Sequence, residues 1–171
     1  MTASNRHGLF EPAIPPPTAR PESDDLTSAP RSEQALFGDS WKISSLVVPQ
    51  VTYTEPEVAT VGLTAGEAAK KGVAIERYHT SLEHNDRCIL EGEDKEGGYV
   101  AVLCAKGSDT VLGATIVASR AGEMVNELTL AIKEGVGLGV IGRVIHAYPT
   151  SGEAVMGCGL AYIRTQWAKL K

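Results

Sequence analysis

Hydrophobic and polar positions alternate in two ways along the chain, first with the spacing of strands and later with that of helices. The stretch 47–54 is rich in β-branched and aromatic residues, which are typical of a strand. Further strands are predicted at 74–81, 87–91, 98–106 and 111–118, with the Gly, Asp and Ser residues of hairpin turns between them. Consecutive hairpins predict an antiparallel sheet.

Two segments in the last third of the chain carry the spacing of amphipathic helices. Apolar residues recur at intervals of three and four from 124 to 132, and Gly135 ends that run. A second apolar stripe runs from 155 to 170. Thr150 and Glu153 stand before it at the spacing of a capping box.

A shorter helix is predicted after the first strand. Thr64 precedes Glu67 at capping-box spacing, and the helix is expected to run through Lys71 and end at Gly72. Strands first and helices afterwards predict an α+β domain, in which an antiparallel sheet has helices packed on one face.

The N-terminal residues differ in composition from the rest. Residues 1–34 contain few core candidates and many breakers, among them the prolines 15–17 and the acidic pair 24–25. Burial within such a segment cannot offset the entropy lost on ordering it. We interpret it as a flexible or weakly docked arm ahead of one domain over residues 35–171. The alternatives are a segment that lies along a neighbouring domain and an organelle-targeting remnant.

Composition narrows the classes of function. The formal net charge of -5 and the pI near 5.4 argue against a nucleic-acid partner, which requires clustered Lys and Arg. No apolar run approaches the roughly 20 residues of a membrane span, and the first residues lack a secretory signal. Three widely spaced cysteines without a Cys-x-x-Cys pair favour a reducing compartment, either cytoplasm or an organelle matrix.

Several residues suggest ligand chemistry but have simpler explanations. The segment 137–142 (GLGVIG) has the spelling of a dinucleotide-binding loop, yet a predicted helix precedes it and no acidic residue follows at about 20 positions, so we interpret its glycines as a helix-to-helix connection. The three cysteines are interpreted as small buried hydrophobes rather than as a binding site for a soft metal. Two histidines and one aspartate that could suggest another metal site are interpreted as polar groups near a strand end. The residues in question are Cys88, Cys104, Cys158, His79, His84 and Asp86.

The segment 145–153 (IHAYPTSGE) is the most informative in the chain. An extended stretch leading through Pro149 into a capped helix can project His146 or Tyr148 outward, and Glu153 can orient a neighbour by hydrogen bonding. Helix capping alone explains Thr150 and Glu153 equally well. The local chemistry leaves both readings open.

This segment resembles the C-terminal signature of the pyridine nucleotide-disulfide oxidoreductases, the superfamily of glutathione reductase, lipoamide dehydrogenase and mercuric reductase. Further segments match in the family's order, so that the resemblance extends from about residue 35 to residue 169. They are 51–63 (VTYTEPEVATVGL), 84–92 (HNDRCILEG), 111–118 (VLGATIVA) and 121–128 (AGEMVNEL).

The resemblance implies a dimerisation domain whose signature residues enter the active site of the other subunit of a homodimer. Tyr148 occupies the position of the family's acid-base histidine, Glu153 matches the glutamate that orients it, and His146 lies where several relatives carry a second histidine. Tyrosine here is similar to the pattern of mercuric-reductase-like members. A phenol titrates near 10 and transfers protons poorly at neutral pH, so ordinary disulfide reduction is not expected.

The full-length family uses FAD and NAD(P)H, whereas this sequence contains neither their binding motifs nor a redox-active cysteine pair, and its last residues lack the vicinal cysteines of true mercuric reductases. We therefore expect the domain to have no oxidoreductase activity alone and to act through dimerisation. One alternative is a non-catalytic regulatory module that pairs with a full-length relative. Another is a thiol-based metal-binding protein.

Overall fold

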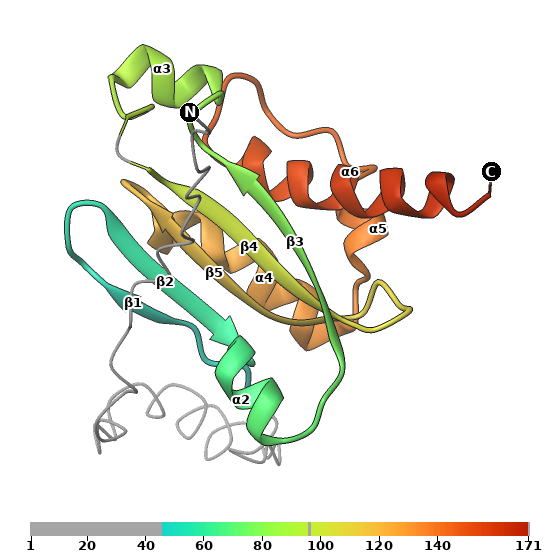
Figure 1. The fold of residues 1–171 in the computed structure, drawn as a ribbon. Helices are drawn as coiled ribbons and strands as arrows, with labels where there is room; N and C mark the ends of the chain where they lie inside the picture. The colour runs from blue at the N-terminus through green and yellow to red at the C-terminus, as the bar shows by residue number, and fades with distance from the viewer. Residues whose placement is uncertain (1–45, 96, 171) are drawn as a thin grey trace, which may run out of the picture. The chain divides into compact units, whose positions relative to one another are not determined.

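The computed structural model describes residues 46–95 and 97–170 (Figure 1). The predicted N-terminal arm and the predicted domain boundary near residue 35 lie outside these residues. The strands are β1 (Gln50–Thr52), β2 (Glu57–Gly62), β3 (Ile75–Ser81), β4 (Tyr99–Ala105) and β5 (Val111–Ala118). The helices are α2 (Ala65–Lys70), α3 (Asp86–Glu91), α4 (Ala121–Glu134), α5 (Leu138–Ile141) and α6 (Glu153–Ala168).

The strands form one antiparallel sheet in the order β1-β2-β5-β4-β3, which confirms the predicted α+β class. Strands β3, β4 and β5 are consecutive neighbours, while β2 pairs with the distant β5 and places Glu57 opposite Ala118. The opening strand is shorter than predicted. It ends at Thr52, and a turn containing the cis Glu55–Pro56 peptide leads into β2 as a second strand.

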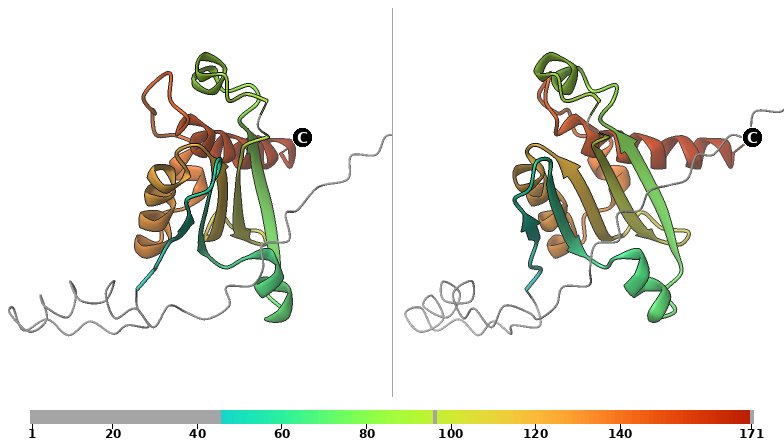
Figure 2. Two further views of the ribbon diagram at one scale, coloured as in Figure 1. Left: turned by 90° about the vertical axis from the view of Figure 1, so that its left-hand side faces the viewer. Right: turned by 60° about the vertical axis from the view of Figure 1, so that its left-hand side comes forward.

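Helices cover one face of the sheet (Figure 2). Helix α4 packs against β2 and β5, and α6 packs against β3 and β4. Burying this face removes apolar side chains from water, and each large one stabilises the fold by about 1.5–3 kcal/mol. The largest fully buried side chains are Ile116, Leu128, Leu138, Val100, Val102, Val125, Val155, Cys88, Cys104 and Cys158. No helix in the described part of the chain is both long and apolar enough to cross a membrane.

Residues 87–91, predicted as a strand, instead form most of helix α3. The Asn85 side chain accepts a hydrogen bond from the Cys88 backbone N–H, which caps the start of the helix. Gly92 ends it in the left-handed conformation with φ of 77°. The strand prediction was wrong because Asn and Gly are typical of hairpin turns as well as of helix ends. Here Asn85 and Gly92 cap the two ends of a short helix of about one and a half turns.

The two predicted capping boxes have different outcomes. At α2, the Thr64 side chain accepts from the Glu67 N–H and the Glu67 carboxylate accepts from the Thr64 N–H, which confirms the prediction. At α6, only the second half of the motif exists, because Glu153 accepts from the Thr150 N–H at 3.2 Å while the Thr150 hydroxyl donates to Ala147. The prediction of a complete box there was wrong.

The glycines of segment 137–142 lie in the connection between α4 and α6, as predicted. This segment also contains the short helix α5. Gly142 lies directly against Gly159 of α6, since a Cβ atom added to Gly142 would be 2.5 Å from the Gly159 carbonyl carbon. A Cβ atom on Gly137 would be 2.1 Å from an oxygen of Asp109. These glycines therefore allow close packing of α5 on its neighbours.

Candidate functional site

The candidate site is the segment between α5 and α6, which α3 and α4 hold from two sides. The Asn85 side-chain amide at the start of α3 donates to the Thr150 carbonyl at 3.0 Å, so the capping residue of α3 also fixes this segment. The buried Ser151 hydroxyl lies 3.8 Å from the Cys88 sulfur of α3. Helix α3 thus fixes the C-terminal half of a segment that has little regular structure of its own.

His146 is held within its own subunit. Its Nε2 atom lies 3.0 and 3.1 Å from the two carboxylate oxygens of Glu127 on α4, and its Nδ1 atom lies 3.0 Å from the Val144 carbonyl oxygen. Its side chain is only 11% exposed. His146 therefore ties the segment to α4. Sequence reasoning did not identify Glu127, which is one polar residue in an amphipathic helix.

Tyr148 is the ring that projects outward, with 70% of the residue exposed. Its hydroxyl donates to the Asp86 carboxylate at the first turn of α3. That hydrogen bond, together with the negative charges of Asp86 and Glu153, raises the pKa of the Tyr148 phenol. Asp86, which the sequence indicated only as a polar residue near a strand end, is thus the carboxylate bound to the exposed phenol.

Glu153 is the first residue of α6. Its carboxylate accepts from the Thr150 backbone N–H, so in this structure it stabilises the turn into the helix rather than binding the Tyr148 hydroxyl. The structure brings Glu153 close enough for its negative charge to help raise the pKa of Tyr148, and it places His146 on a different carboxylate.

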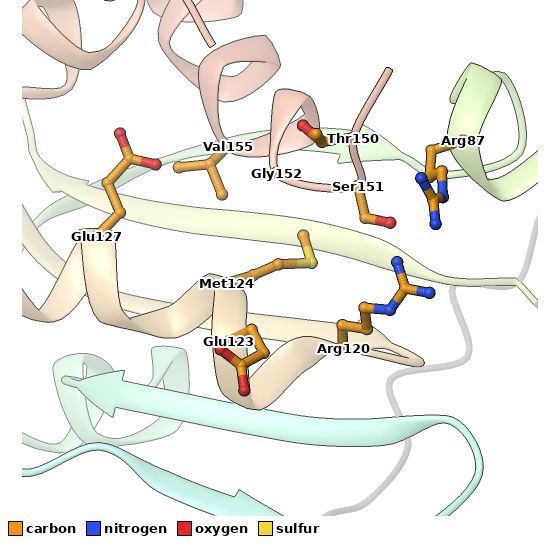
Figure 3. Close-up of a pocket in the computed structure, with 9 residues that line it drawn as sticks. All are labelled: Arg87, Arg120, Glu123, Met124, Glu127, Thr150, Ser151, Gly152 and Val155. Atoms are coloured by element: carbon orange, nitrogen blue, oxygen red, sulfur yellow. The ribbon is translucent and has the colours of Figure 1, made fainter. Parts of the chain in front are cut away.

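A pocket of about 290 Å³ opens beside this segment, between α4 and the start of α6 (Figure 3). Arg87 and Arg120 approach it from one end, and both bind the Glu91 carboxylate, at 2.5 and 2.8 Å. The two guanidinium groups lower the pKa of Glu91. Met124 and Val155 supply apolar lining.

All three cysteines are buried free thiols. Burial raises the pKa of Cys104 to about 12 and that of Cys158 to about 11, and it also raises the pKa of Cys88. Across the described residues, no three His, Cys, Asp or Glu side chains are grouped as a metal site would require. His79 instead lies beside the Tyr99 ring, with ring centroids 5.6 Å apart.

Burial predicts that the thiols of the native chain react very slowly. For Cys104, raising the pKa from 9.0 to about 12 reduces the thiolate fraction at neutral pH about a thousandfold, and the thiolate is the nucleophile. We expect little labelling by a maleimide in native buffer and labelling of all three cysteines in denaturant, measured by mass spectrometry. Rapid native labelling of Cys104 or Cys158 would contradict this packing.

Comparison with known proteins agrees with the fold. Residues 48–157 match the family model described as pyridine nucleotide-disulphide oxidoreductase, dimerisation domain. The chain is 35% identical over 123 residues to a dihydrolipoyl dehydrogenase of Staphylococcus aureus, covering 72% of this chain and 26% of that protein. It is 38% identical over 133 residues to the dihydrolipoyl dehydrogenase of Trypanosoma brucei brucei, covering 77% of this chain and 27% of that protein.

Solved structures share the fold at low sequence identity. LpdA from Mycobacterium tuberculosis has a TM-score of 0.65 and 19% identity, with 78% of this chain and 28% of that chain covered. The Cu(II) complex of the flavoprotein disulfide reductase RclA from Escherichia coli has a TM-score of 0.68 and 18% identity, with 76% of this chain and 30% of that chain covered.

The fold and the matched residues define the class of protein. This chain belongs to the family of pyridine nucleotide-disulfide oxidoreductase dimerisation domains. It spans about a quarter of the length of the curated relatives it matches. The resemblance of its 145–153 segment to the family's signature therefore lies within a domain whose family membership is established.

Proposed function

We propose that the domain forms the homodimer of an FAD-dependent, NAD(P)H-linked oxidoreductase and presents its His146–Glu153 edge to the active site of the partner subunit. The family match over residues 48–157 supports this function. The observation that carries it is the combination, on one edge, of an outward phenol at Tyr148 and exposed apolar side chains beside it.

The exposed apolar side chains form a surface that we name the α4–α5 patch. Ile145 is 95% exposed, beside His146, whose bond to Glu127 places the segment against α4. Leu130 follows Glu127 by one helical turn and is also exposed. Large apolar side chains that are exposed on a folded domain favour a protein partner where several lie near one another. The patch comprises Leu130, Val140, Val144 and Ile145.

A second copy of the chain is the partner that we propose for this patch. Homo-oligomers most often pair by twofold symmetry, which brings the same patch from each subunit together. A permanent dimer of this kind buries roughly 2,000 Å² or more, and its contact area is more apolar than that of transient complexes. The edge carrying Tyr148 then lies close to the other subunit.

The described residues do not fit a dinucleotide cofactor. The one glycine-rich segment joins two helices, and the space next to its first and last glycines is filled by Asp109 and Gly159. FAD and NAD(P)H belong, in this proposal, to other domains of a full-length oxidoreductase. The finer assignment that we propose is a mercuric-reductase-like enzyme, because Tyr148 stands where disulfide-reducing relatives use an imidazole.

Sedimentation equilibrium tests the dimer. The chain is expected to sediment as a dimer at micromolar concentration, and Ile145→Asp should convert it to a monomer because a carboxylate would be desolvated in an apolar contact. The matched control is Leu170→Asp, which alters another exposed apolar residue beyond the far end of α6 and should leave the dimer intact. A monomeric unaltered chain would overturn the proposal, and so would bound flavin absorbance in the purified domain.

A further inference from the structure

We infer that Asp86 is the positioning residue of Tyr148, taking the place of Glu153 as the carboxylate partner of the signature side chain. The Tyr148 hydroxyl donates to Asp86, which is far from it in sequence. This role rests on the proposed function, because the phenol that Asp86 positions is the group offered to the partner subunit.

The contacts of α3 support this role from two directions. Asn85 donates through its side-chain amide to the Thr150 carbonyl at 3.0 Å, and the next residue, Asp86, accepts from Tyr148. Two adjacent residues of one helix start therefore hold the segment on both sides of Pro149. The backbone contact sets the path of the segment, and the side-chain contact sets the direction of the phenol.

Glu153 has a different partner. Its carboxylate accepts from the Thr150 N–H at 3.2 Å, a bond within the turn into α6. His146, the other ring of the signature, is held by Glu127 at 3.0 Å. Each of the three carboxylates near the segment thus has its own role, and Asp86 is the one whose hydrogen-bond partner is largely exposed.

The direction of this hydrogen bond determines what Tyr148 can offer. A phenol has one proton to donate, and it is committed to Asp86, so the oxygen faces its surroundings with its acceptor lone pairs. Such an oxygen can accept a hydrogen bond from a thiol or coordinate a metal ion. It is a poor donor to a leaving thiolate, which fits a mercuric-reductase-like acceptor better than a disulfide.

Titration of Tyr148 tests the assignment in the chain as it exists. Tyrosine labelled with carbon-13 at Cζ gives one NMR resonance per ring, and Tyr148→Phe identifies the resonance of Tyr148 by its loss. Asp86→Asn removes the charge but keeps a side-chain oxygen, so the Tyr148 midpoint is expected to shift to lower pH, towards 10.0. Asp86→Glu should restore most of the shift.

Glu153→Gln is the competing variant. If Glu153 were the partner, its neutralisation would move the Tyr148 midpoint more than Asp86→Asn does, and the inference would be overturned. An unchanged midpoint in Asp86→Asn would overturn it too. Because Cys88 in α3 is buried, its slow reaction with a maleimide verifies that Asp86→Asn leaves the helix folded.

Sedimentation of the same samples separates this inference from the proposed function. If the chain is a dimer and Asp86→Asn leaves the titration midpoint of Tyr148 unchanged, the proposed function stands and Asp86 is not the positioning residue. A monomer whose midpoint follows Asp86 would support the hydrogen-bonded pair but remove the partner site, which overturns the positioning role towards that site. The expected result is a dimer in which Asp86 controls the titration.

Discussion

Replacing Gly159 by alanine is expected to lower the free energy of unfolding by about 3 kcal/mol, the upper part of the range for overpacked cores. The added Cβ atom would lie 2.3 Å from the Gly142 backbone nitrogen and 2.8 Å from the Leu138 carbonyl oxygen. Both neighbours are backbone atoms, so no side chain can rotate away. The helix pair α5 and α6 must separate, which chemical denaturation monitored by circular dichroism will detect.

Gly66 provides the matched control for this substitution. It lies in α2 with no atom within 4 Å of an added Cβ atom. Gly66→Ala should therefore stabilise the domain by about 0.5–1 kcal/mol, because alanine loses less backbone entropy in a helix. Equal effects of the two substitutions would mean that α5 and α6 do not pack closely at Gly159.

Replacing Leu128 by alanine is expected to destabilise the domain by about 3 kcal/mol, within the range measured for buried leucines. Leu128 is fully buried on the inner face of α4, where that helix packs against β2 and β5. The loss combines the transfer free energy of three buried carbon atoms with the cost of the cavity that the rigid neighbours leave open. Thermal or urea unfolding of the variant measures it.

Leu130→Ala is the control on the same helix. Leu130 is 61% exposed, so in a monomeric Ile145→Asp background its truncation should change the unfolding free energy by less than about 0.5 kcal/mol. In the dimeric chain the same change should weaken association, since Leu130 belongs to the α4–α5 patch. A large loss in the monomer would show that α4 is rotated relative to its described position.

Sequence periodicity was sufficient for most of the sheet and for both long helices. Strands β3 and β5 and helices α4 and α6 follow apolar patterns because each buries mainly one face. Strand β4 is instead recognised by a continuous apolar run, since five consecutive residues of it are buried. It was insufficient for α3 and α5, whose few residues do not complete a periodic stripe. There the signals are the capping residues alone, as with Asn85 and Gly92, and these also suit a hairpin.

The candidate site was predictable in its location but not in its contacts. The sequence drew attention to His146, Tyr148 and Glu153 because they surround a proline at the start of a helix. Their partners Glu127 and Asp86 come from other elements, and tertiary packing alone brings them to the segment. A local motif has no information about side chains that are distant in sequence.

The sheet order has a consequence for how the chain folds during synthesis on the ribosome. Strand β2 pairs with β1 and β5, and β5 leaves the ribosome well after β2 because α2, β3, α3 and β4 lie between them. Until β5 is synthesised, the β2 edge that will pair with it stays unpaired in the nascent β1–β2 hairpin. An isolated two-stranded hairpin is only marginally stable in water. The β3–β4–β5 meander can form from neighbouring segments, and β2 then docks onto its edge. Pairing β2 with β5 closes a long loop and has an entropic cost that local hairpins avoid. We expect misassembly to occur at this step.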